Sequence, residues 1–231
     1  MKGIVIACEG LDGSGKSTHA RLLARELCSL GRTARVFGLN DNPHLNKQWS
    51  ILNQNDLIGP VEAALMQSAE LLGRLEYSIR PLIQERAVVI WDKYVAGSLA
   101  TFLVREVPAQ YLEILRRTLP EPDLTLFFDV SPEEALSRKQ RSGGPGFFES
   151  GLDRSLGLPL REAYTKWEKG ELDPDLVAQH FKLFQANLRK AYEVFLPVKD
   201  ILRFDSTGQI RKLANKVCAC VREFISHIPA N

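Results

Sequence analysis

One eight-residue segment constrains this chain more than any other feature: residues 10–17 read Gly-Leu-Asp-Gly-Ser-Gly-Lys-Ser. A glycine, four residues and then Gly-Lys-Ser is the pattern of a phosphate-binding loop, or P-loop. An apolar run at residues 4–8 precedes the segment, and a helical pattern that begins at Ser17 follows it. Strand, loop and helix in that order are the context that this motif requires, so the segment predicts a P-loop NTPase fold.

Each part of this loop has a chemical task. The glycines let successive backbone N–H groups turn toward phosphate oxygens, and the start of the following helix adds a partial positive charge. Lys16 can reach the β- and γ-phosphates, and the Ser17 hydroxyl can hold the Mg²⁺ that bridges them. The motif therefore predicts binding of ATP with Mg²⁺, through Gly10, Leu11, Asp12, Gly13, Ser14, Gly15, Lys16, Ser17 and Thr18.

Five short apolar runs recur along the chain, at residues 4–8, 34–39, 87–91, 124–130 and 201–204. They are largely continuous rather than alternating, as is typical of strands covered on both faces. Helical patterns lie between them. We therefore expect an α/β fold, with a five-stranded parallel sheet flanked by helices on both faces.

Local signals indicate where several helices begin and end. One helix is expected from Ser17 to Leu30, and a long helical stretch over residues 60–86 has an expected break near Pro81. Ser131 is followed by Pro-Glu-Glu, a capping box with proline at the first helical position, which predicts a helix through Arg138. The last helix is expected to place its apolar stripe between residues 210 and 224.

The composition narrows the class of protein. The 231 residues are 45% hydrophobic and 25% charged, which fits a single globular domain over residues 1–231. A formal net charge of +2 gives no general attraction to nucleic acid or to anionic membranes, and no apolar run approaches the roughly 18 residues of a membrane span. The N-terminus does not resemble a signal peptide, so we expect a cytoplasmic enzyme or binding protein.

One segment departs from the alternation of strands and helices. Residues 142–146, Ser-Gly-Gly-Pro-Gly, are followed by a polar stretch to about Pro174. Basic residues lie just before this stretch and in its first half: Arg138, Lys139, Arg141, Arg154 and Arg161. Both a mobile basic flap over an anionic substrate and a solvated surface loop would have this composition. We refer to residues 138–175 as the lid.

The motifs together resemble the thymidylate kinase family of nucleoside monophosphate kinases. Residues 9–18 match its E-G-x-D-G-x-G-K-S-T loop, residues 88–94 are similar to its strand that ends in Asp-Arg-Tyr, and residues 128–138 are close to its D-V-x-P-E-x-A-L-x-R run. A weaker match covers residues 184–192. The resemblance implies an ATP-dependent phosphotransferase that acts on a nucleoside 5′-monophosphate, with dTMP as the default acceptor, and relatives are often homodimers.

The resemblance also implies roles for individual residues. Asp12 and Lys16 would be catalytic together with arginines of the lid, and Ser17 and Asp92 would hold the metal. The proposed catalytic set is Asp12, Lys16, Arg138, Arg141 and Arg154, and the proposed acceptor-binding set is Asp12, Asp92, Lys93, Arg74 and Thr101.

Several positions depart from the family pattern on the acceptor side. Residues 38–43 lack the family's phosphate-binding arginine. Lys93 replaces the arginine of Asp-Arg-Tyr, which keeps the positive charge but loses the pair of parallel hydrogen bonds that a guanidinium can donate to a phosphate. The family's base-stacking phenylalanine and base-reading arginine should fall near Gln67 and Leu71, where neither residue type is present. Met66, Arg74 or Tyr77 could take their place. The family's tyrosine that blocks a 2′-hydroxyl corresponds to Thr101, which leaves room for that group. Two alternatives therefore stay open: a kinase of the same fold for another nucleotide or phosphorylated metabolite, and a non-catalytic ATP-binding protein.

Overall fold

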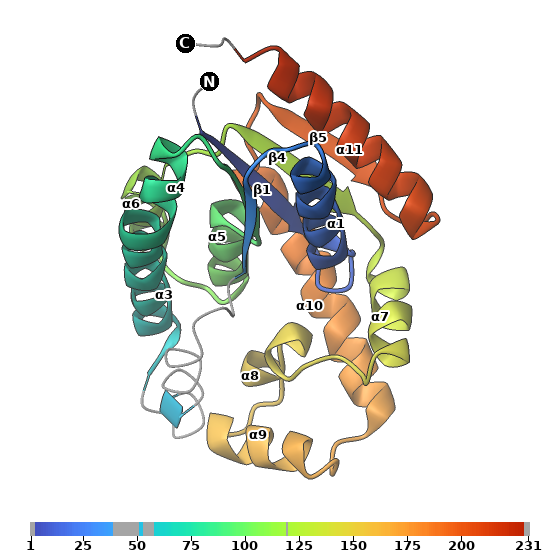
Figure 1. Cartoon of the computed structure of the whole chain (residues 1–231). Coiled ribbons are helices and arrows are strands. Elements are labelled where there is room, and N and C mark those ends of the chain that lie inside the picture. Colours follow the sequence, from blue (N-terminus) through green and yellow to red (C-terminus); the bar gives the residue numbers. More distant parts are fainter. Residues whose placement is uncertain (1–2, 39–50, 53–57, 119, 229–231) are drawn as a thin grey trace.

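The computed structural model describes residues 3–38, 51–52, 58–118 and 120–228, and it contains one sheet of five parallel strands (Figure 1). The strand order is β2-β3-β1-β4-β5. The P-loop NTPase architecture expected from the sequence is confirmed, and each expected strand agrees with an observed one to within two residues at each end. The strands are β1 (Ile4–Gly10), β2 (Ala34–Gly38), β3 (Val88–Asp92), β4 (Leu124–Asp129) and β5 (Ile201–Asp205).

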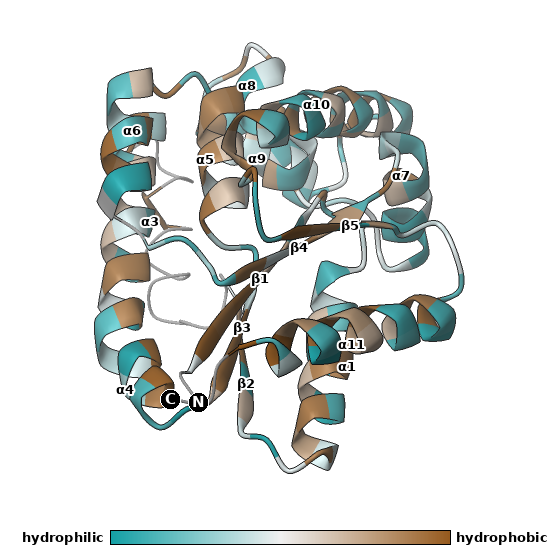
Figure 2. Cartoon of the chain, turned by 90° about the horizontal axis from the view of Figure 1, so that it is seen from above, coloured by the Kyte–Doolittle hydropathy of each residue, from teal (hydrophilic) through white to brown (hydrophobic). Residues whose placement is uncertain are grey.

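Alternating side chains of the central strand β1 pack on opposite faces of the sheet. Ile4, Ile6 and Cys8 are buried in a core formed with α1 (Lys16–Ser29) and α11 (Ile210–Ser226). Ala7 is buried among residues of the other face. Figure 2 shows α1 and α11 on one side of the sheet and α5 and α10 on the other. Burial on both faces explains why the strands have nearly continuous apolar sequences.

The second face is covered by a longer series of helices. The expected helical stretch over residues 60–86 divides at a π-helical turn (Leu75–Ile79), earlier than the expected break near Pro81. Pro81 lies in the first turn of α4, which continues directly from the π-helical turn. Within the residues that the structure describes, no helix is long and apolar enough to cross a membrane. The helices here are α3 (Pro60–Arg74), α4 (Arg80–Gln84), α5 (Val95–Val104), α6 (Ala109–Thr118) and α10 (Pro174–Phe195).

The lid lies beyond the carboxyl ends of the strands and is folded rather than irregular (Figure 1). Ser131 caps α7 (Pro132–Arg141) as predicted, since its hydroxyl accepts a hydrogen bond from the Glu134 N–H at 3.2 Å. The Glu134 carboxylate, which would complete the predicted capping box, instead accepts a hydrogen bond from Arg138 Nε at 2.8 Å. The stretch that we expected to be polar has an apolar core of its own, in which Phe147, Leu152 and Ala163 are buried. Its elements are a 3₁₀ turn (Phe148–Ser150), α8 (Leu152–Ser155) and α9 (Leu160–Glu168).

Candidate active site

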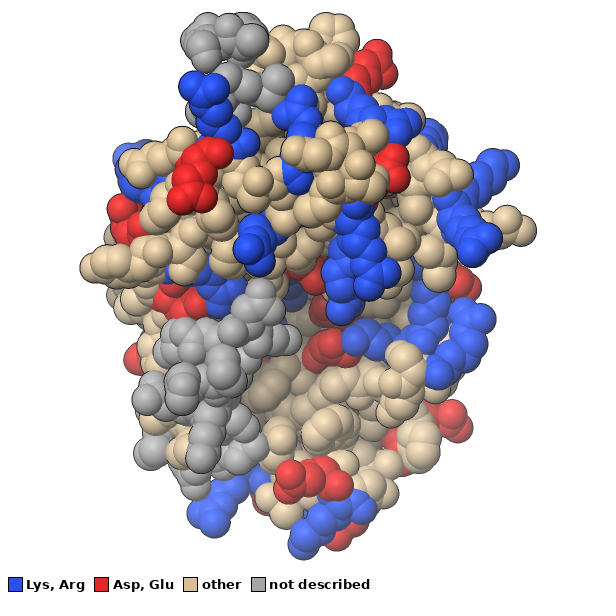
Figure 3. Space-filling view, in the orientation of Figure 1, with Lys and Arg blue, Asp and Glu red and all other residues tan. Residues whose placement is uncertain are grey.

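A cavity of about 1690 Å³ lies between the P-loop, the end of β3 and the lid. In Figure 3 this region is a hollow with Lys, Arg, Asp and Glu side chains around it. Open parallel sheets bind ligands at this edge, where loops follow the carboxyl ends of the strands. Most of the residues that sequence analysis selected meet in the cavity wall: Asp12, Gly13, Gly15, Lys16, Ser17, Thr18, Asp92, Lys93, Thr101, Arg138, Arg141 and Arg154.

The P-loop backbone has the conformation that anion binding requires. Gly13 has φ 89° and Gly15 has φ 90°, in the left-handed region that favours glycine. A Cβ atom at Gly13 would also lie 2.7 Å from the Ala135 carbonyl oxygen of α7. Among the described residues, the N–H groups of Gly13, Gly15, Lys16 and Ser17 have no hydrogen-bond partner. These four donors at the start of α1 are suited to phosphate oxygens.

The Lys16 ammonium lies inside the loop and is only 7% exposed as a residue. It donates to the Leu11 carbonyl oxygen at 3.1 Å and to Asp12 Oδ1 at 3.3 Å. An ammonium has three donors, so one is left for a phosphate oxygen. Burial alone would lower the pKa of Lys16, but the Asp12 and Asp92 carboxylates outweigh it and raise that pKa above the ordinary value. The side chain is therefore a fixed positive charge.

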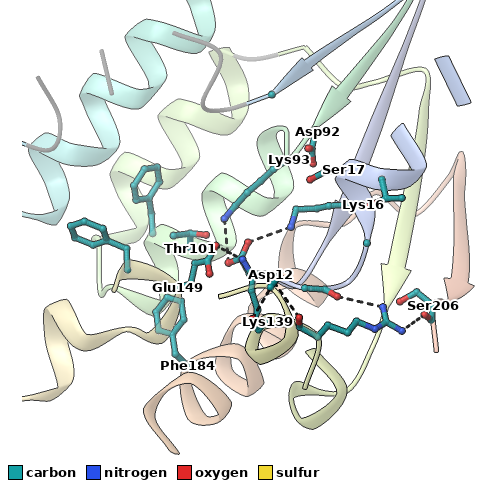
Figure 4. Close-up of a pocket in the computed structure, with 18 of the residues that line it drawn as sticks. Asp12, Lys16, Ser17, Asp92, Lys93, Thr101, Lys139, Glu149, Phe184 and Ser206 are labelled. Carbon is teal, nitrogen blue, oxygen red and sulfur yellow. Dashed lines mark hydrogen bonds and ion pairs between the residues drawn. The ribbon is translucent and has the colours of Figure 1, made fainter. Parts of the chain in front are cut away.

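The Asp12 carboxylate lies between two ammonium groups, as Figure 4 shows. Besides the Lys16 contact, its Oδ2 atom is 4.0 Å from Lys93 Nζ. Burial acts to raise the pKa of Asp12, but Lys93, Lys16 and Lys139 together lower it well below the ordinary value. Asp12 therefore stays ionised over the whole physiological range and can accept hydrogen bonds from a ligand hydroxyl.

Lys93 owes its position to an unusual backbone conformation. Its φ is 63°, in the left-handed region that side chains seldom adopt, and its N–H donates to the Cys8 carbonyl oxygen at 2.9 Å. The neighbouring Gly97 of α5 gives the side chain room, because a Cβ there would lie 2.9 Å from Lys93 Cγ. Backbone strain of this kind is concentrated at functional sites.

Glu9, at the end of β1, is a buried carboxyl group to which sequence analysis gave no role. It is 1% exposed, accepts a hydrogen bond from the Tyr94 N–H at 3.1 Å and lies 3.3 Å from the Tyr192 hydroxyl. Burial raises the pKa of Glu9 from 4.5 to about 7, although Lys93 and Lys16 act in the opposite direction. The signal in the sequence was an acidic residue inside an apolar strand, directly before the loop.

The raised pKa of Glu9 predicts a specific pH dependence of stability. Between pH 4.5 and 7 the folded protein keeps the Glu9 proton that the unfolded chain loses, so the free energy of unfolding falls as the pH rises. A shift of this size corresponds to about 3 kcal/mol. Glu9→Gln has no titrating group at this position and nearly the same shape. Its free energy of unfolding relative to wild type is therefore expected to rise by about 3 kcal/mol between pH 4.5 and 8.5.

Denaturant unfolding of both proteins at five or six pH values measures the difference between their free energies of unfolding. The contributions of the other titrating groups are common to both proteins and cancel in this difference. A difference that stays constant with pH would show that Glu9 titrates normally.

Asp92 and Ser17 fit a divalent metal ion. Asp92 Oδ1 is buried and has no hydrogen-bond partner among the described residues, and in Figure 4 the carboxylate lies beside the Ser17 hydroxyl. In the described part of the chain, no group of three or more His, Cys, Asp or Glu side chains could enclose a metal. One hydroxyl and one carboxylate suit Mg²⁺, since one or two protein oxygens commonly hold this ion beside substrate phosphates and water.

The three lid arginines differ in their surroundings. Arg138 is anchored, because it donates to the carbonyl oxygens of Gly13 at 3.4 Å and Ser206 at 2.5 Å. It therefore joins α7 to the P-loop and to the loop after β5. Arg141 is 68% exposed beside Glu134, and Arg154 is 46% exposed and paired with Glu106. All three line the cavity, and the assignment of a catalytic arginine stays a prediction.

Arg74 is the one acceptor-binding candidate that the structure places away from the cavity wall. It forms an ion pair with Glu70 and donates to the Gly38 carbonyl oxygen, so it ties α3 to the end of β2. Tyr77 is 87% exposed and also lies outside the cavity lining, whereas Met66 and Gln67 belong to it. Of residues 38–43, only Gly38 lies within the described part of the chain.

Two side chains that contact the lid have no counterpart in the sequence analysis. Arg105, at the end of α5, binds Asp153 through its Nε atom at 2.8 Å and donates to the Phe148 carbonyl oxygen at 2.9 Å. Gln185 of α10 is fully buried and contacts both Asp12 and the lid. Gln185 falls within the weaker match over residues 184–192, but neither side chain was given a role, because their partners are more than 30 residues away in the chain.

Comparison with known proteins gives a consistent result. The family model described as thymidylate kinase matches residues 8–149. The chain is 29% identical to a probable thymidylate kinase 2 of Saccharolobus solfataricus over 73% of this chain and 79% of that protein. It is 31% identical to a probable thymidylate kinase of Pyrobaculum aerophilum (62% and 73%) and 28% identical to a thymidylate kinase of a Thermoanaerobacter species (73% and 85%).

Proposed function

The chain belongs to the thymidylate kinase family, and we propose that it transfers the γ-phosphoryl group of Mg-ATP to the 5′-phosphate of dTMP. One observation carries this proposal: Lys16 of the P-loop and Lys93 of the β3 edge converge on the same carboxylate, Asp12, in one cavity. A donor site and an acceptor site that share a boundary residue are what transfer between two bound phosphates requires.

The donor side consists of the P-loop. The N–H groups at the start of α1, which have no partner within the described part of the chain, bind the β- and γ-phosphates, and Lys16 contributes its remaining donor to the same oxygens. Arg138 holds the loop in shape through its contact with the Gly13 carbonyl oxygen. The residues assigned to ATP are Gly10, Leu11, Asp12, Gly13, Ser14, Gly15, Lys16, Ser17 and Thr18.

The acceptor side consists of Asp12, Lys93 and Thr101. Lys93 neutralises the acceptor phosphate, whose oxygen attacks the γ-phosphorus while the bond from that phosphorus to the bridging oxygen of ADP breaks. Asp12 accepts a hydrogen bond from the acceptor sugar. The attacking phosphate is already anionic near neutral pH, so the step needs no strong general base.

The lid and the metal ligands complete the site. Arg141 and Arg154 line the cavity and supply positive charge to the oxygens of the transferring group, and a closed lid excludes water. Ser17 and Asp92 would hold Mg²⁺, since Asp92 Oδ1 is buried and has no hydrogen-bond partner in the described part of the chain. The bound ion would supply positive charge beside the phosphates of ATP.

Three broader parts of the proposal rest on the resemblance and the sequence. We place residues 1–231 in a single kinase domain, expect a homodimer and expect the protein to work in the cytoplasm. Light scattering coupled to size-exclusion chromatography measures the oligomeric state, and cell fractionation tests the location.

The deciding experiment measures ADP release from Mg-ATP with purified protein. The acceptors are dTMP, dUMP, UMP, CMP, GMP and AMP, together with the remaining deoxy forms. The expected result is a preference for dTMP in kcat/KM. A clear preference for another monophosphate would replace dTMP as the acceptor, and ATP binding without turnover on any acceptor would refute the kinase assignment.

A further inference from the structure

Gln185 is a side chain with complete burial and no place in the mechanism above. It is 0% exposed and lies in the middle of α10, on the face that packs against the P-loop and the lid. A buried amide is costly unless its hydrogen bonds are satisfied, so its partners are informative.

The amide of Gln185 contacts Asp12 twice. Its Oε1 atom accepts a hydrogen bond from the Asp12 backbone N–H at 3.1 Å, and its Nε2 atom donates to Asp12 Oδ2 at 3.4 Å. These two contacts fix both the backbone and the carboxylate of Asp12. They hold the same oxygen that lies 4.0 Å from Lys93 Nζ.

The same amide also contacts the lid. Gln185 Nε2 donates to the Glu149 carbonyl oxygen at 2.8 Å, within the 3₁₀ turn. The Glu149 side chain is held separately by Lys139 at 2.7 Å. One side chain thus joins the lid, the P-loop and α10.

The partners admit only one orientation of the amide. In the reverse orientation, the NH₂ group would face the Asp12 N–H, and the carbonyl oxygen would face the Asp12 carboxylate and the Glu149 carbonyl oxygen. Every contact would then be repulsive. The hydrogen bonds of Gln185 therefore fix the position of Asp12, whereas an apolar residue of equal size would form none of them.

We propose that Gln185 is a positioning residue, which holds the Asp12 carboxylate in its productive orientation and links that orientation to the docked lid at Glu149. This inference rests on the proposed function, because it requires a task for Asp12 in phosphoryl transfer. Gln185 does not touch the reacting atoms and acts through Asp12.

The test compares three variants by steady-state kinetics with dTMP and saturating Mg-ATP. Gln185→Met keeps the length of the side chain without its hydrogen bonds and is expected to lower kcat/KM for dTMP by about 10- to 100-fold. Its KM for ATP is expected to change by less than about threefold. Asn187→Met is the control, because Asn187 is an exposed amide two residues along the same helix, and it is expected to keep wild-type kinetics.

Gln185→Glu makes the hydrogen-bond donor at this position depend on pH. At pH 8 its carboxylate would repel Asp12 and could not donate to Glu149. As the pH falls the carboxyl is protonated and regains a donor, so the ratio of variant to wild-type kcat/KM is expected to rise. The ratio for Gln185→Met should stay flat. If Gln185→Met does not fold, Gln185→Glu carries the test alone.

A double variant tests whether Gln185 acts through Asp12. In an Asp12→Asn background, Gln185→Met is expected to cost less than about threefold, since the residue that it positions is already altered. Equal losses in both backgrounds, or equal increases in KM for ATP and dTMP, would overturn the positioning role. Inactive wild-type protein would instead refute the proposed function, whereas active wild type with an unimpaired Gln185→Met variant would refute only this inference.

Discussion

Lys16→Ala is expected to lower kcat/KM for Mg-ATP by about 1000-fold, the loss typical of removing one fixed charge from a transition state. The ammonium is held by Leu11 and Asp12 and has one donor left for the phosphates. Its hydrogen bonds hold the ammonium in place and the Asp12 and Asp92 carboxylates keep it charged, so it needs no reorganisation during transfer. Lys16→Arg is expected to be nearly as inactive, since a planar guanidinium does not fit the space of a compact ammonium.

The measurement is ADP release at varied ATP concentration and saturating dTMP, with circular dichroism to establish that the variants are folded. Lys190→Ala is the control, because Lys190 is an exposed lysine of α10, and it should behave as wild type. Removing Lys16 also leaves Asp12 with fewer cations, so a rise in KM for dTMP is expected besides the loss on the ATP side. Activity of Lys16→Ala within threefold of wild type would show that the P-loop does not act as assigned.

The donor side was predictable because its determinants are local. The glycines, Lys16 and Ser17 occupy one continuous segment, and the strand before it and the helix after it follow from short-range patterns of apolar residues. The five strands were located for the same reason. Buried parallel strands are short apolar runs, and an error of one or two residues at an end does not change the topology.

The lid and the acceptor side depend on long-range contacts, which no local pattern encodes. The apolar core of the lid is assembled from Phe147, Leu152 and Ala163, which are spread over a segment that mixes apolar and charged residues. Arg74 stays a predicted acceptor residue, but it is absent from the cavity lining, whereas its partners Glu70 and Gly38 belong to that lining. Gln185 was overlooked because its partner Asp12 is 173 residues away. Sequence patterns locate the motifs but not the residues that position them.

Asp92→Asn is expected to lower kcat by about 100-fold at physiological Mg²⁺ and to raise the Mg²⁺ concentration needed for half-maximal activity by at least tenfold. The Asp92 carboxylate lies beside Ser17 and has a buried oxygen with no hydrogen-bond partner among the residues that the structure describes, so this oxygen can bind a cation. Asparagine keeps the shape of the side chain but removes its charge. Its NH₂ group can also face the metal position, where Mg²⁺ requires an oxygen ligand.

Titration of activity with free Mg²⁺ at fixed ATP separates this role from others. Ser17→Ala should shift the curve in the same direction but by less, because a neutral hydroxyl contributes less than a carboxylate. Asp175→Asn, at an exposed carboxylate in the first turn of α10, is the control and should leave the curve unchanged. If Asp92→Asn lowered kcat without altering the Mg²⁺ requirement, Asp92 would have a different role. Its charge would then act by fixing the neighbouring Lys16, whose pKa it raises, rather than by binding the metal.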